Sequence, residues 1–397
     1  KVKADADTIL DNDDAVLLVL LDQSAAFDII HHEILLERLE KEARIKGNAV
    51  AWIRSYLNER RQRVVVSDSC SEESTLPTGV PQGSVLGPLL FTLYIRPLQD
   101  IIEKHRIQRH HYADDSQLYT RLRLKGNRGT DIPEDVNRME RCLDDVRNWL
   151  TTNHLKLNES KTEVLIICKK HHQQYLSHIK LRIGADIIEP ATHVRDLGSW
   201  LDNTLSMQKQ VSQTVKSGYF HLKRISRIRR HLDEGTCAKV LNSTVTSRMD
   251  YQNALLAGAR QCITQPLQRM QNNAARLLSR AGPRDHITPV LRELHWLPVQ
   301  QRCDYKLLTM IHEALYNEHA PAYMRNMFPK YDPTRSLRSG DSDLLRVARV
   351  TVHEGERSAP HHGAKLWNKL PTNLRQTEGI KSFRKNLKTW LYNVTFN

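Results

Sequence analysis

A run of seven apolar residues that ends at an aspartate most constrains what this chain can fold into. The run extends from Ala15 to Leu21, and Asp22 follows it directly. A continuous apolar run of this length predicts a strand that is buried on both faces, in the interior of a sheet. Asp22 is therefore expected at the carboxyl end of a central strand, where its side chain leaves the core.

A pair of adjacent acids, Asp114 and Asp115, interrupts a second strand-like segment. Residues 107–112 precede the turn Tyr112-Ala113-Asp114-Asp115 and residues 116–120 follow it, a pattern that predicts a hairpin with the acids at its tip. Like charges at close range raise each other's pKa, and a divalent cation such as Mg²⁺ relieves the repulsion. The alternative for these two residues alone is an ordinary Asp-rich turn.

The remaining segments alternate helix and strand signals. A Gly/Pro-rich loop at 78–88 precedes a helix that is predicted to begin at Leu89 and continue through Leu98. Asp131 and Pro133 open an amphipathic helix that ends near Leu150. Further helices are predicted at 33–45, 49–57, 267–279 and 300–316, and strands at 64–66, at 163–168 after a loop with Lys161, and as a pair within 179–201.

The charge balance favours a polyanionic partner. Lys and Arg total 59 against 45 Asp and Glu, a net charge of +14, which favours nucleic acid first and an anionic membrane surface second. No apolar run approaches the roughly 18–20 residues that span a bilayer, and no signal peptide is apparent. We therefore expect a protein that is neither membrane-spanning nor secreted. The length of 397 residues predicts two or three domains.

The cysteines and histidines show no metal-binding pattern. The six cysteines lack any paired ligand spacing, so we expect a reducing compartment and no structural zinc. Histidine doublets such as His171-His172 would point to opposite faces of a strand, which makes them poor paired ligands.

A basic helix is predicted after Asp202. Residues 203–232 contain no acidic residue and seven basic ones. Its apolar residues Val211, Val215, Leu222 and Ile225 share one face, and its basic residues Lys216, Lys223, Arg227 and Arg230 share another. Such a stripe predicts contact with a phosphate backbone, and the alternative is a solvated helix.

Taken in order, these motifs resemble those of a known family. Residues 21–28 (Leu-Asp-Gln-Ser-Ala-Ala-Phe-Asp), 81–88 (Pro-Gln-Gly-Ser-Val-Leu-Gly-Pro) and 112–115 resemble motifs A, B and C of reverse transcriptases. The resemblance is greatest to the non-LTR (LINE-type, CR1/Jockey-like) retrotransposons. Residues 155–163 and 195–202 are similar to motifs D and E, and 282–286, 294–298 and 366–371 to the carboxyl-terminal region of this group.

The resemblance implies an α+β fold, the right-hand polymerase. It predicts a palm of antiparallel sheet backed by helices, with partial fingers, at 1–202, a helical, basic, thumb-like region at 203–280, and a mostly helical carboxyl-terminal region at 281–397. Because only 21 residues precede Asp22, we expect the carboxyl portion of a larger open reading frame, without most of the fingers or an endonuclease.

The resemblance also implies an activity and its residues. The activity is RNA-directed DNA polymerisation with two Mg²⁺ ions, or Mn²⁺ as an alternative. The implied metal ligands are Asp22, Asp114, Asp115 and the backbone carbonyl of Gln23, with Lys161 as a catalytic general acid for pyrophosphate. The implied nucleotide-binding residues are Phe27, Gln82, Gly83 and Tyr112, and Leu197-Gly198 would form the primer grip.

The implied partners are an RNA template, a DNA primer and dNTPs, in the nucleus and cytoplasm. Gln23 departs from the family's usual aliphatic residue, and 29–32 from its usual acid before the histidine. Two alternatives stay open. One is a catalytically inactive relic that only binds nucleic acid, and the other is an RNA-templated RNA polymerase, which Phe27 disfavours because its ring should exclude a ribose 2′-hydroxyl.

Overall fold

The computed structural model describes residues 1–124, 132–332 and 343–397. Two compact units are formed: a sheet unit, Asp14–Leu197, and a helical unit, Lys1–Asp13 with Gly198–Asn397. The chain contains both helices and sheets, in agreement with the predicted α+β class. The expected boundaries at 202 and 280 stay predictions, and residues 1–13 belong to the helical unit.

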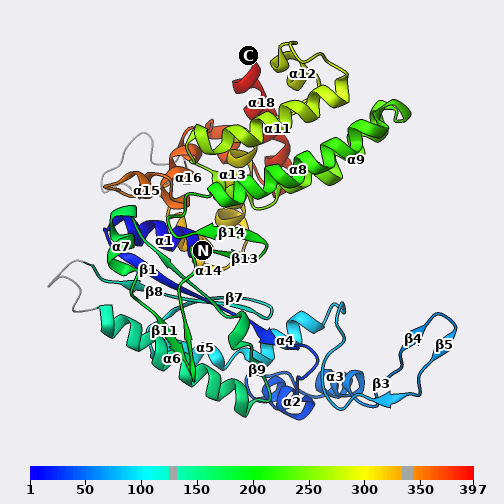
Figure 1. Cartoon of the computed structure of the whole chain (residues 1–397), viewed down its shortest axis with the longest axis vertical. Coiled ribbons are helices and arrows are strands. Elements are labelled where there is room, and N and C mark those ends of the chain that lie inside the picture. The colour runs from blue at the N-terminus through cyan, green and yellow to red at the C-terminus, as the bar shows by residue number, and fades with distance from the viewer. Residues whose placement is uncertain (125–131, 333–342) are drawn as a thin grey trace. The chain divides into compact units, whose positions relative to one another are not determined.

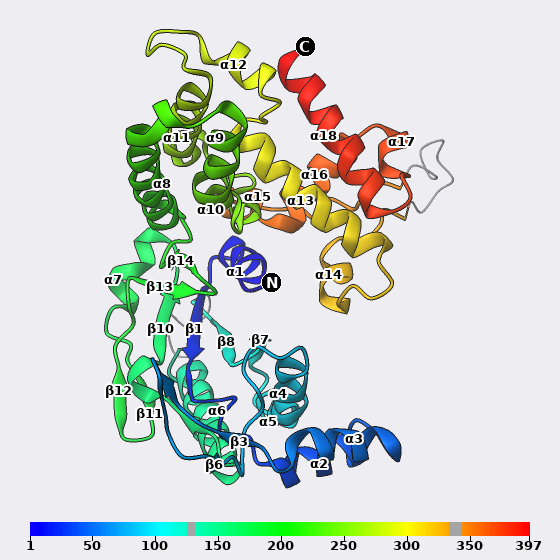
Figure 2. The same ribbon diagram turned by 90° about the vertical axis from the view of Figure 1, so that its right-hand side faces the viewer.

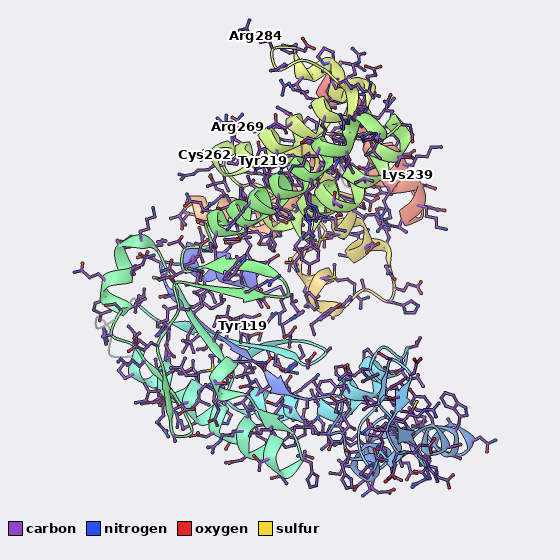
Figure 3. All side chains as sticks on the ribbon, turned by 45° about the vertical axis from the view of Figure 1, so that its right-hand side comes forward. Tyr119, Tyr219, Lys239, Cys262, Arg269 and Arg284 are labelled. Atoms are coloured by element: carbon purple, nitrogen blue, oxygen red, sulfur yellow. The ribbon has the colours of Figure 1, made fainter. Side chains whose placement is uncertain are left out.

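The sheet unit is built on four antiparallel strands (Figure 1). Their order is β10-β1-β8-β7, with bounds β1 (Ala15–Leu21), β7 (Gln108–Tyr112), β8 (Asp115–Leu122) and β10 (Glu163–Ile167). β1 lies between β8 and β10, and Val16 to Val19 have 0% exposure. The predicted central, doubly buried strand is confirmed. Tyr119 of β8 is also fully buried in this sheet (Figure 3).

Helices pack against the sheet and against one another in this unit. The helices of this unit are α2 (His32–Lys41), α3 (Asn48–Leu57), α4 (Gly87–Ile95), α5 (Leu98–Lys104), α6 (Ile132–Thr152) and α7 (Gln173–Leu176), with 3₁₀ turns η1 (Glu159–Lys161) and η2 (Lys170–His172). The predicted stripe of α6 is confirmed, since Met139, Leu143 and Val146 are fully buried. Asp131 lies outside the described residues.

One predicted helix is divided in two. The segment expected to run from Leu89 through Leu98 forms α4, which already begins at Gly87, and α5, which begins at Leu98. Pro97 stands between them as the residue before α5, and a proline ring cannot donate the backbone hydrogen bond that would continue α4. Pro88 is accommodated in the first turn of α4, where no donor is needed.

Short strands complete the sheet unit. They form the pairs β2 (Gln23–Ser24) with β9 (Lys156–Leu157), β3 (Arg61–Gln62) with β6 (Ser74–Thr75), β4 (Val65–Val66) with β5 (Ser69–Cys70), and β11 (Leu181–Ile183) with β12 (Asp186–Ile188), and β13 (His193–Asp196) is the last strand. The strand predicted at 64–66 forms β4, which pairs with β5 in an exposed hairpin. Val66 in it is 68% exposed.

The helical unit is dominated by long helices (Figure 2). Its elements are α1 (Val2–Asp11), β14 (Ser199–Asp202), α8 (Gln208–Ile228), η3 (Arg229–His231), α9 (Glu234–Leu241), η4 (Asn242–Thr246), α10 (Ser247–Asp250), η5 (Asn253–Leu256), α11 (Gln261–Ser279), α12 (Ile287–Glu293), α13 (Val299–Tyr316), α14 (Ala322–Met327), α15 (His353–Glu356), α16 (Ala359–Asn368), α17 (Thr372–Arg375) and α18 (Ile380–Phe396). Gly218 lets α8 approach α11, because a Cβ there would lie 2.0 Å from Met270 Sδ. Among the described residues, no helix is long and apolar enough to cross a membrane.

The amino-terminal helix α1 is held by the carboxyl-terminal region. The backbone amides of Thr351 and Val352 each donate to Asp11 Oδ1 at 2.9 Å, and the Thr351 hydroxyl donates to the Asp11 carbonyl at 2.9 Å. A Cβ at Gly355 would lie 2.4 Å from Asp11 Oδ1. The segment that leads into β1 is therefore anchored more than three hundred residues away in sequence.

Candidate active site

The register between β1 and β8 brings distant acids to one edge of the sheet. Leu21 of β1 pairs with Ser116 of β8. Asp22 follows Leu21 and Asp115 precedes Ser116, so the two carboxylates flank the same end of this antiparallel pair. The buried strand β1 thus places Asp22 close to a hairpin that is distant from it in sequence.

The Asp114-Asp115 hairpin has the predicted form. Tyr112 of β7 pairs with Asp115 of β8, which leaves Ala113 and Asp114 as a two-residue tip. Ala113 adopts φ 53°, the left-handed conformation that tight hairpin turns require. Asp114 is half-buried, and Tyr112 is 65% exposed beside it.

Electrostatic repulsion marks this cluster. The pKa of Asp115 is raised by partial burial, by Asp114 and by Asp22, in that order. Two carboxylates that oppose the ionisation of a third are an unfavourable arrangement in the absence of a counter-charge. Their oxygens are the hard donors that Mg²⁺ and Mn²⁺ accept, so the residues present fit a divalent ion.

Asp22 is held by the segment that follows α6. The Asn158 backbone amide donates to the Asp22 carbonyl at 2.9 Å, and its side-chain Nδ2 donates to Asp22 Oδ2 at 3.1 Å. Lys161 Nζ lies 3.8 Å from the same Oδ2, with 71% of the lysine side chain exposed. The pairing of Gln23 with Leu157 fixes this segment against β2. Gln23 itself is buried, and its Oε1 has no hydrogen-bond partner among the described residues.

The glycine loop is fixed to the segment after Asp22. Gln82 Nε2 donates to both carboxylate oxygens of Asp28 at 3.1 Å, and the Val80 amide donates to the Phe27 carbonyl at 2.8 Å. Gly79 has φ 86°, and a Cβ there would lie 2.6 Å from the Asp28 carbonyl oxygen, so only glycine fits. The ring centroid of Phe27 lies 5.0 Å from that of Phe91 on α4.

A cavity of about 410 Å³ adjoins the carboxylates. Its lining includes Asp22, Asp115, Lys161 and Leu197, together with Asp196. Phe27, Gln82, Gly83 and Tyr112 do not line it within the described part of the chain. Of the predicted catalytic residues, Asp22, Asp115 and Lys161 line this cavity, and Asp114 is not among its described lining residues. Of the predicted nucleotide-binding residues, Gln82 and Gly83 lie on the glycine loop.

The comparisons with known proteins bear on this geometry. Residues 3–180 match the family model described as reverse transcriptase (RNA-dependent DNA polymerase). Residues 3–180 are therefore similar to a reverse transcriptase domain. The matched range contains Asp22, Asp114, Asp115 and Lys161 and ends before Asp196.

The related proteins come from mobile elements of flies. The chain is 26% identical over 212 residues to the probable RNA-directed DNA polymerase from transposon BS of Drosophila melanogaster. This alignment covers 52% of the chain and 22% of that protein. It is 29% identical over 209 residues to the RNA-directed DNA polymerase from mobile element jockey of Drosophila funebris, which covers 50% and 21%. The resemblance to a non-LTR, Jockey-like reverse transcriptase is confirmed. The chain spans about a fifth of the length of these relatives.

A solved telomerase structure is also similar, but weakly. The telomerase from Candida albicans in complex with a fragment of telomeric RNA shares 11% sequence identity and a TM-score of 0.31, over 73% of this chain and 47% of that one. A score this low carries no argument about the fold of the reverse transcriptase domain.

Residues outside the matched range show local features of their own. Leu197 and Gly198 have φ of 44° and 83°, so both adopt the left-handed conformation of a sharp turn. On α8 and η3, the predicted basic residues Lys216, Lys223, Arg227 and Arg230 are all exposed. Arg229 is buried, because it donates to the carbonyls of Leu277 and Leu278 at the end of α11.

Tyr219 of α8 and Arg269 of α11 project from neighbouring helices of the helical unit (Figure 3). The Tyr219 hydroxyl accepts a hydrogen bond from Asn273 of α11 at 2.9 Å, so this aromatic side chain ties the two helices together. Beside it, Phe220 is 59% exposed, and the Arg224 guanidinium lies 5.6 Å from its ring centroid. Aromatic side chains therefore stand among the basic ones on α8.

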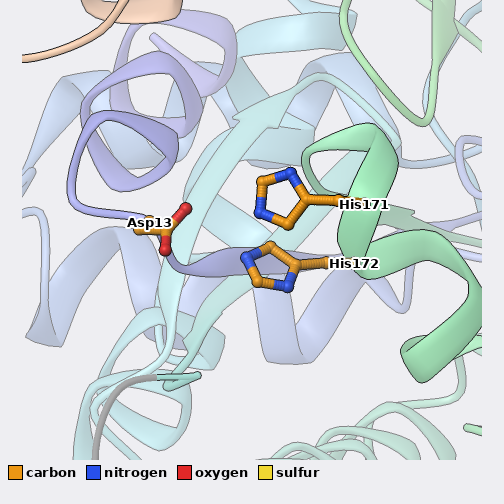
Figure 4. Close-up of side chains that lie close together, drawn as sticks. All are labelled: Asp13, His171 and His172. Carbon is orange, nitrogen blue, oxygen red and sulfur yellow. The ribbon is translucent and has the colours of Figure 1, made fainter.

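The argument against paired histidine ligands fails at His171 and His172. They lie in the 3₁₀ turn η2 rather than in a strand, and their ring centroids are 4.0 Å apart (Figure 4). Side chains on a turn of this kind need not alternate between faces.

Asp196 is a further carboxylate that lines the cavity, and it was not predicted from the sequence as a site residue. Asp196 accepts a hydrogen bond from Gln117 Nε2 at 2.5 Å, and Gln117 is two residues from Asp115 on β8. Burial raises the pKa of Asp196 to about 6, the Gln117 bond opposes this rise, and Asp115 adds to it. Asp196 lies in the segment 195–202 that resembles motif E, but its partner is 79 residues away in sequence, so no local pattern shows this contact.

We predict that Asp196→Asn gains stability relative to the wild type as pH rises from about 4 to about 7 in EDTA. The folded-state pKa of about 6 exceeds the ordinary value of 3.8. The unfolded chain therefore releases this proton first, and the wild type loses stability across that window. With solvent screening, the loss is about 1–2 kcal/mol. Asparagine cannot ionise, and its Oδ1 can still accept from Gln117.

The measurement is the urea midpoint of wild type and variant at both pH values. Asp68→Asn, at an exposed carboxylate of the same unit, is the matched control and should show no such pH dependence. A difference between Asp196→Asn and wild type that is equal at both pH values would contradict the assignment.

Proposed function

We propose that this chain is the polymerase portion of an RNA-directed DNA polymerase, which adds dNTPs to a DNA primer on an RNA template. The observation that carries the proposal is the β1–β8 register, which places Asp22 and Asp115 at one sheet edge beside Asp114. The arrangement supplies three carboxylates at the ends of paired strands, and nucleotidyl transfer needs such a fixed site.

Asp22, Asp114 and Asp115 would hold two Mg²⁺ ions, or Mn²⁺, with the Gln23 backbone carbonyl assisting. Bound ions supply activation of the primer 3′-hydroxyl and neutralisation of the triphosphate charge. The fit rests on the hard oxygen donors and on the raised pKa of Asp115, which a neighbouring cation would lower.

Two residues of the chain would orient the Asp22 carboxylate and protonate the leaving pyrophosphate. Asn158 would keep the Asp22 carboxylate turned toward the site through its 3.1 Å hydrogen bond. Lys161 forms only a long, exposed ion pair with Asp22, so its ammonium is free to turn to a triphosphate and donate a proton to pyrophosphate.

The glycine loop would form the nucleotide pocket. Phe27, supported by Phe91, would stack under the incoming deoxyribose, and Gln82 and Gly83 would line the dNTP and template side. The Gln82–Asp28 hydrogen bonds hold the loop in this position. Tyr112, exposed beside the hairpin tip, would contact the primer end, and Leu197-Gly198 would form the primer grip.

In polymerase terms, we propose that the four-stranded sheet with its helices is the palm, joined by partial fingers. The exposed basic residues Lys216, Lys223, Arg227 and Arg230 of the thumb-like region would follow the phosphate backbone of the template–primer. Asp202 supports this helix, because its carboxylate accepts from the backbone amides of Ser206 and Met207 at 2.9 Å ahead of α8.

We predict that Asp114→Asn abolishes Mg²⁺-dependent primer extension on an RNA template. The change removes one negative charge from the carboxylate cluster with little change in shape, so extension should fall at least about 10²-fold. Primer extension from a labelled DNA primer measures this loss, and fluorescence anisotropy checks that template–primer binding is kept. Asp68→Asn is the matched control.

The alternative, a nucleic-acid-binding relic, predicts a different result. If the wild-type chain binds template–primer and extends nothing with either Mg²⁺ or Mn²⁺, the relic interpretation replaces the polymerase.

We predict that Phe27→Val reduces discrimination against ribonucleotides by about 10–100-fold, measured as the ratio of kcat/KM for dNTP and NTP. The smaller side chain would leave space for a 2′-hydroxyl beneath the sugar. Phe91→Leu is the control, since it alters the same ring contact from the buried side. Equal use of NTPs and dNTPs by the wild type would favour an RNA polymerase instead.

A further inference from the structure

A second cavity, of about 310 Å³, lies in the helical unit. We call it the α13–α18 pocket, because it lies at α13 and α18, which pack side by side (Figure 2). Its lining includes Asn253, Arg302, Tyr305, Lys306 and Lys388. No residue proposed above for polymerase chemistry belongs to it.

The pocket carries two uncompensated positive charges. Arg302 is neutralised by Asp250, since its Nε donates to Asp250 Oδ1 at 2.8 Å and its second nitrogen pairs with Oδ2. Lys306 and Lys388 have no carboxylate within ion-pair distance in the part of the chain that the structure describes. Arg384, near Lys388 on α18, is already paired with Glu313 at 2.9 Å. Two free ammonium groups at one cavity attract an anionic group.

A buried acceptor points to the same ligand. Asn253 is only 4% exposed, and its Nδ2 donates to Asp250 Oδ1 at 3.1 Å. Its Oδ1 is buried and has no hydrogen-bond partner among the described residues. Buried polar atoms without partners are rare, because they lose their bond to water and gain nothing in return. The pocket therefore suits a ligand that combines an anion with a hydrogen-bond donor.

The surroundings favour a polymer over a single small molecule. α18 (Ile380–Phe396) contains no acidic residue, and Lys381 and Lys385 are exposed along it. A helix with repeated positive charges suits successive phosphates. Leu297 and the Tyr305 ring add an apolar part to the lining, against which a base or sugar can lie.

We propose that the α13–α18 pocket binds one nucleotide of a single-stranded nucleic acid. Its phosphate lies at Lys306 and Lys388, and a base amino group or a ribose 2′-hydroxyl donates to Asn253 Oδ1. This goes beyond the proposed polymerase activity, because it assigns a strand-holding role to the carboxyl-terminal region.

The test measures binding of a labelled 20-nucleotide RNA, and of DNA of the same sequence, to the full chain in EDTA by fluorescence anisotropy at several salt concentrations. Lys306→Ala/Lys388→Ala should weaken binding about tenfold and lower the slope of log affinity against log salt by about 1. Lys365→Ala/Lys369→Ala, which removes two exposed lysines at α16 of the same unit, is the matched control. Equal effects of the two double variants would overturn the proposal.

Asn253→Leu tests the acceptor. A larger loss for RNA than for DNA identifies the 2′-hydroxyl as the donor, and an equal loss identifies the base. Unchanged binding of both strands overturns the assigned contact. If 10 mM inorganic phosphate abolishes the difference between wild type and the pocket variant, the pocket is a free-phosphate site and the proposal is wrong.

Because EDTA excludes polymerisation, this result is independent of the proposed function. A wild type that binds through the pocket but extends no primer contradicts only the polymerase. A wild type that extends primers while the pocket variant binds like the control contradicts only the pocket.

Discussion

The antiparallel pairing of β1 with β8 is the interaction on which the catalytic site depends. Its register places Leu21 opposite Ser116, and the pairing is stabilised by burial of apolar side chains from both strands. Each buried Val or Leu contributes about 1.5–3 kcal/mol, which offsets the repulsion among the carboxylates at the strand ends. The pKa of Asp115 is raised first by its partial burial and then by Asp114 and Asp22. The buried sheet thus holds three carboxylates close together, and a bound cation would relieve the repulsion among them.

Periodicity predicted the parts of the fold that follow from local sequence. The doubly buried β1, the acidic hairpin and the apolar stripe of α6 were predicted, because each depends on neighbouring side chains. The division at Pro97 was missed, since apolar spacing continues across it. The hydrogen bonds from Asn158 to Asp22 and from Gln117 to Asp196 join residues 136 and 79 apart, and no local pattern specifies such pairs. Arg229 shows the same limit, because a basic residue in a basic run proved to be a buried helix cap.

Charge is used differently in the two units. In the sheet unit, partial burial and the neighbouring Asp114 and Asp22 raise the pKa of Asp115. In the helical unit, Asp202 accepts a hydrogen bond from a backbone amide ahead of α8. Asp250 and Glu313 form ion pairs with Arg302 and Arg384. Lys306 and Lys388 are consequently left without an ion pair among the described residues and can bind an external polyanion. The anchoring of α1 by residues 351–355 makes the carboxyl-terminal region part of the same folded unit as the segment ahead of β1.

The most direct test of the account is anomalous diffraction from crystals of this chain grown with Mn²⁺, a template–primer and a non-hydrolysable dNTP analogue. The account predicts anomalous peaks within coordination distance of the carboxylates of Asp22, Asp114 and Asp115. Peaks located elsewhere, or none at these carboxylates while the dNTP analogue is bound, would contradict the claim that the β1–β8 register builds a divalent-metal polymerase site.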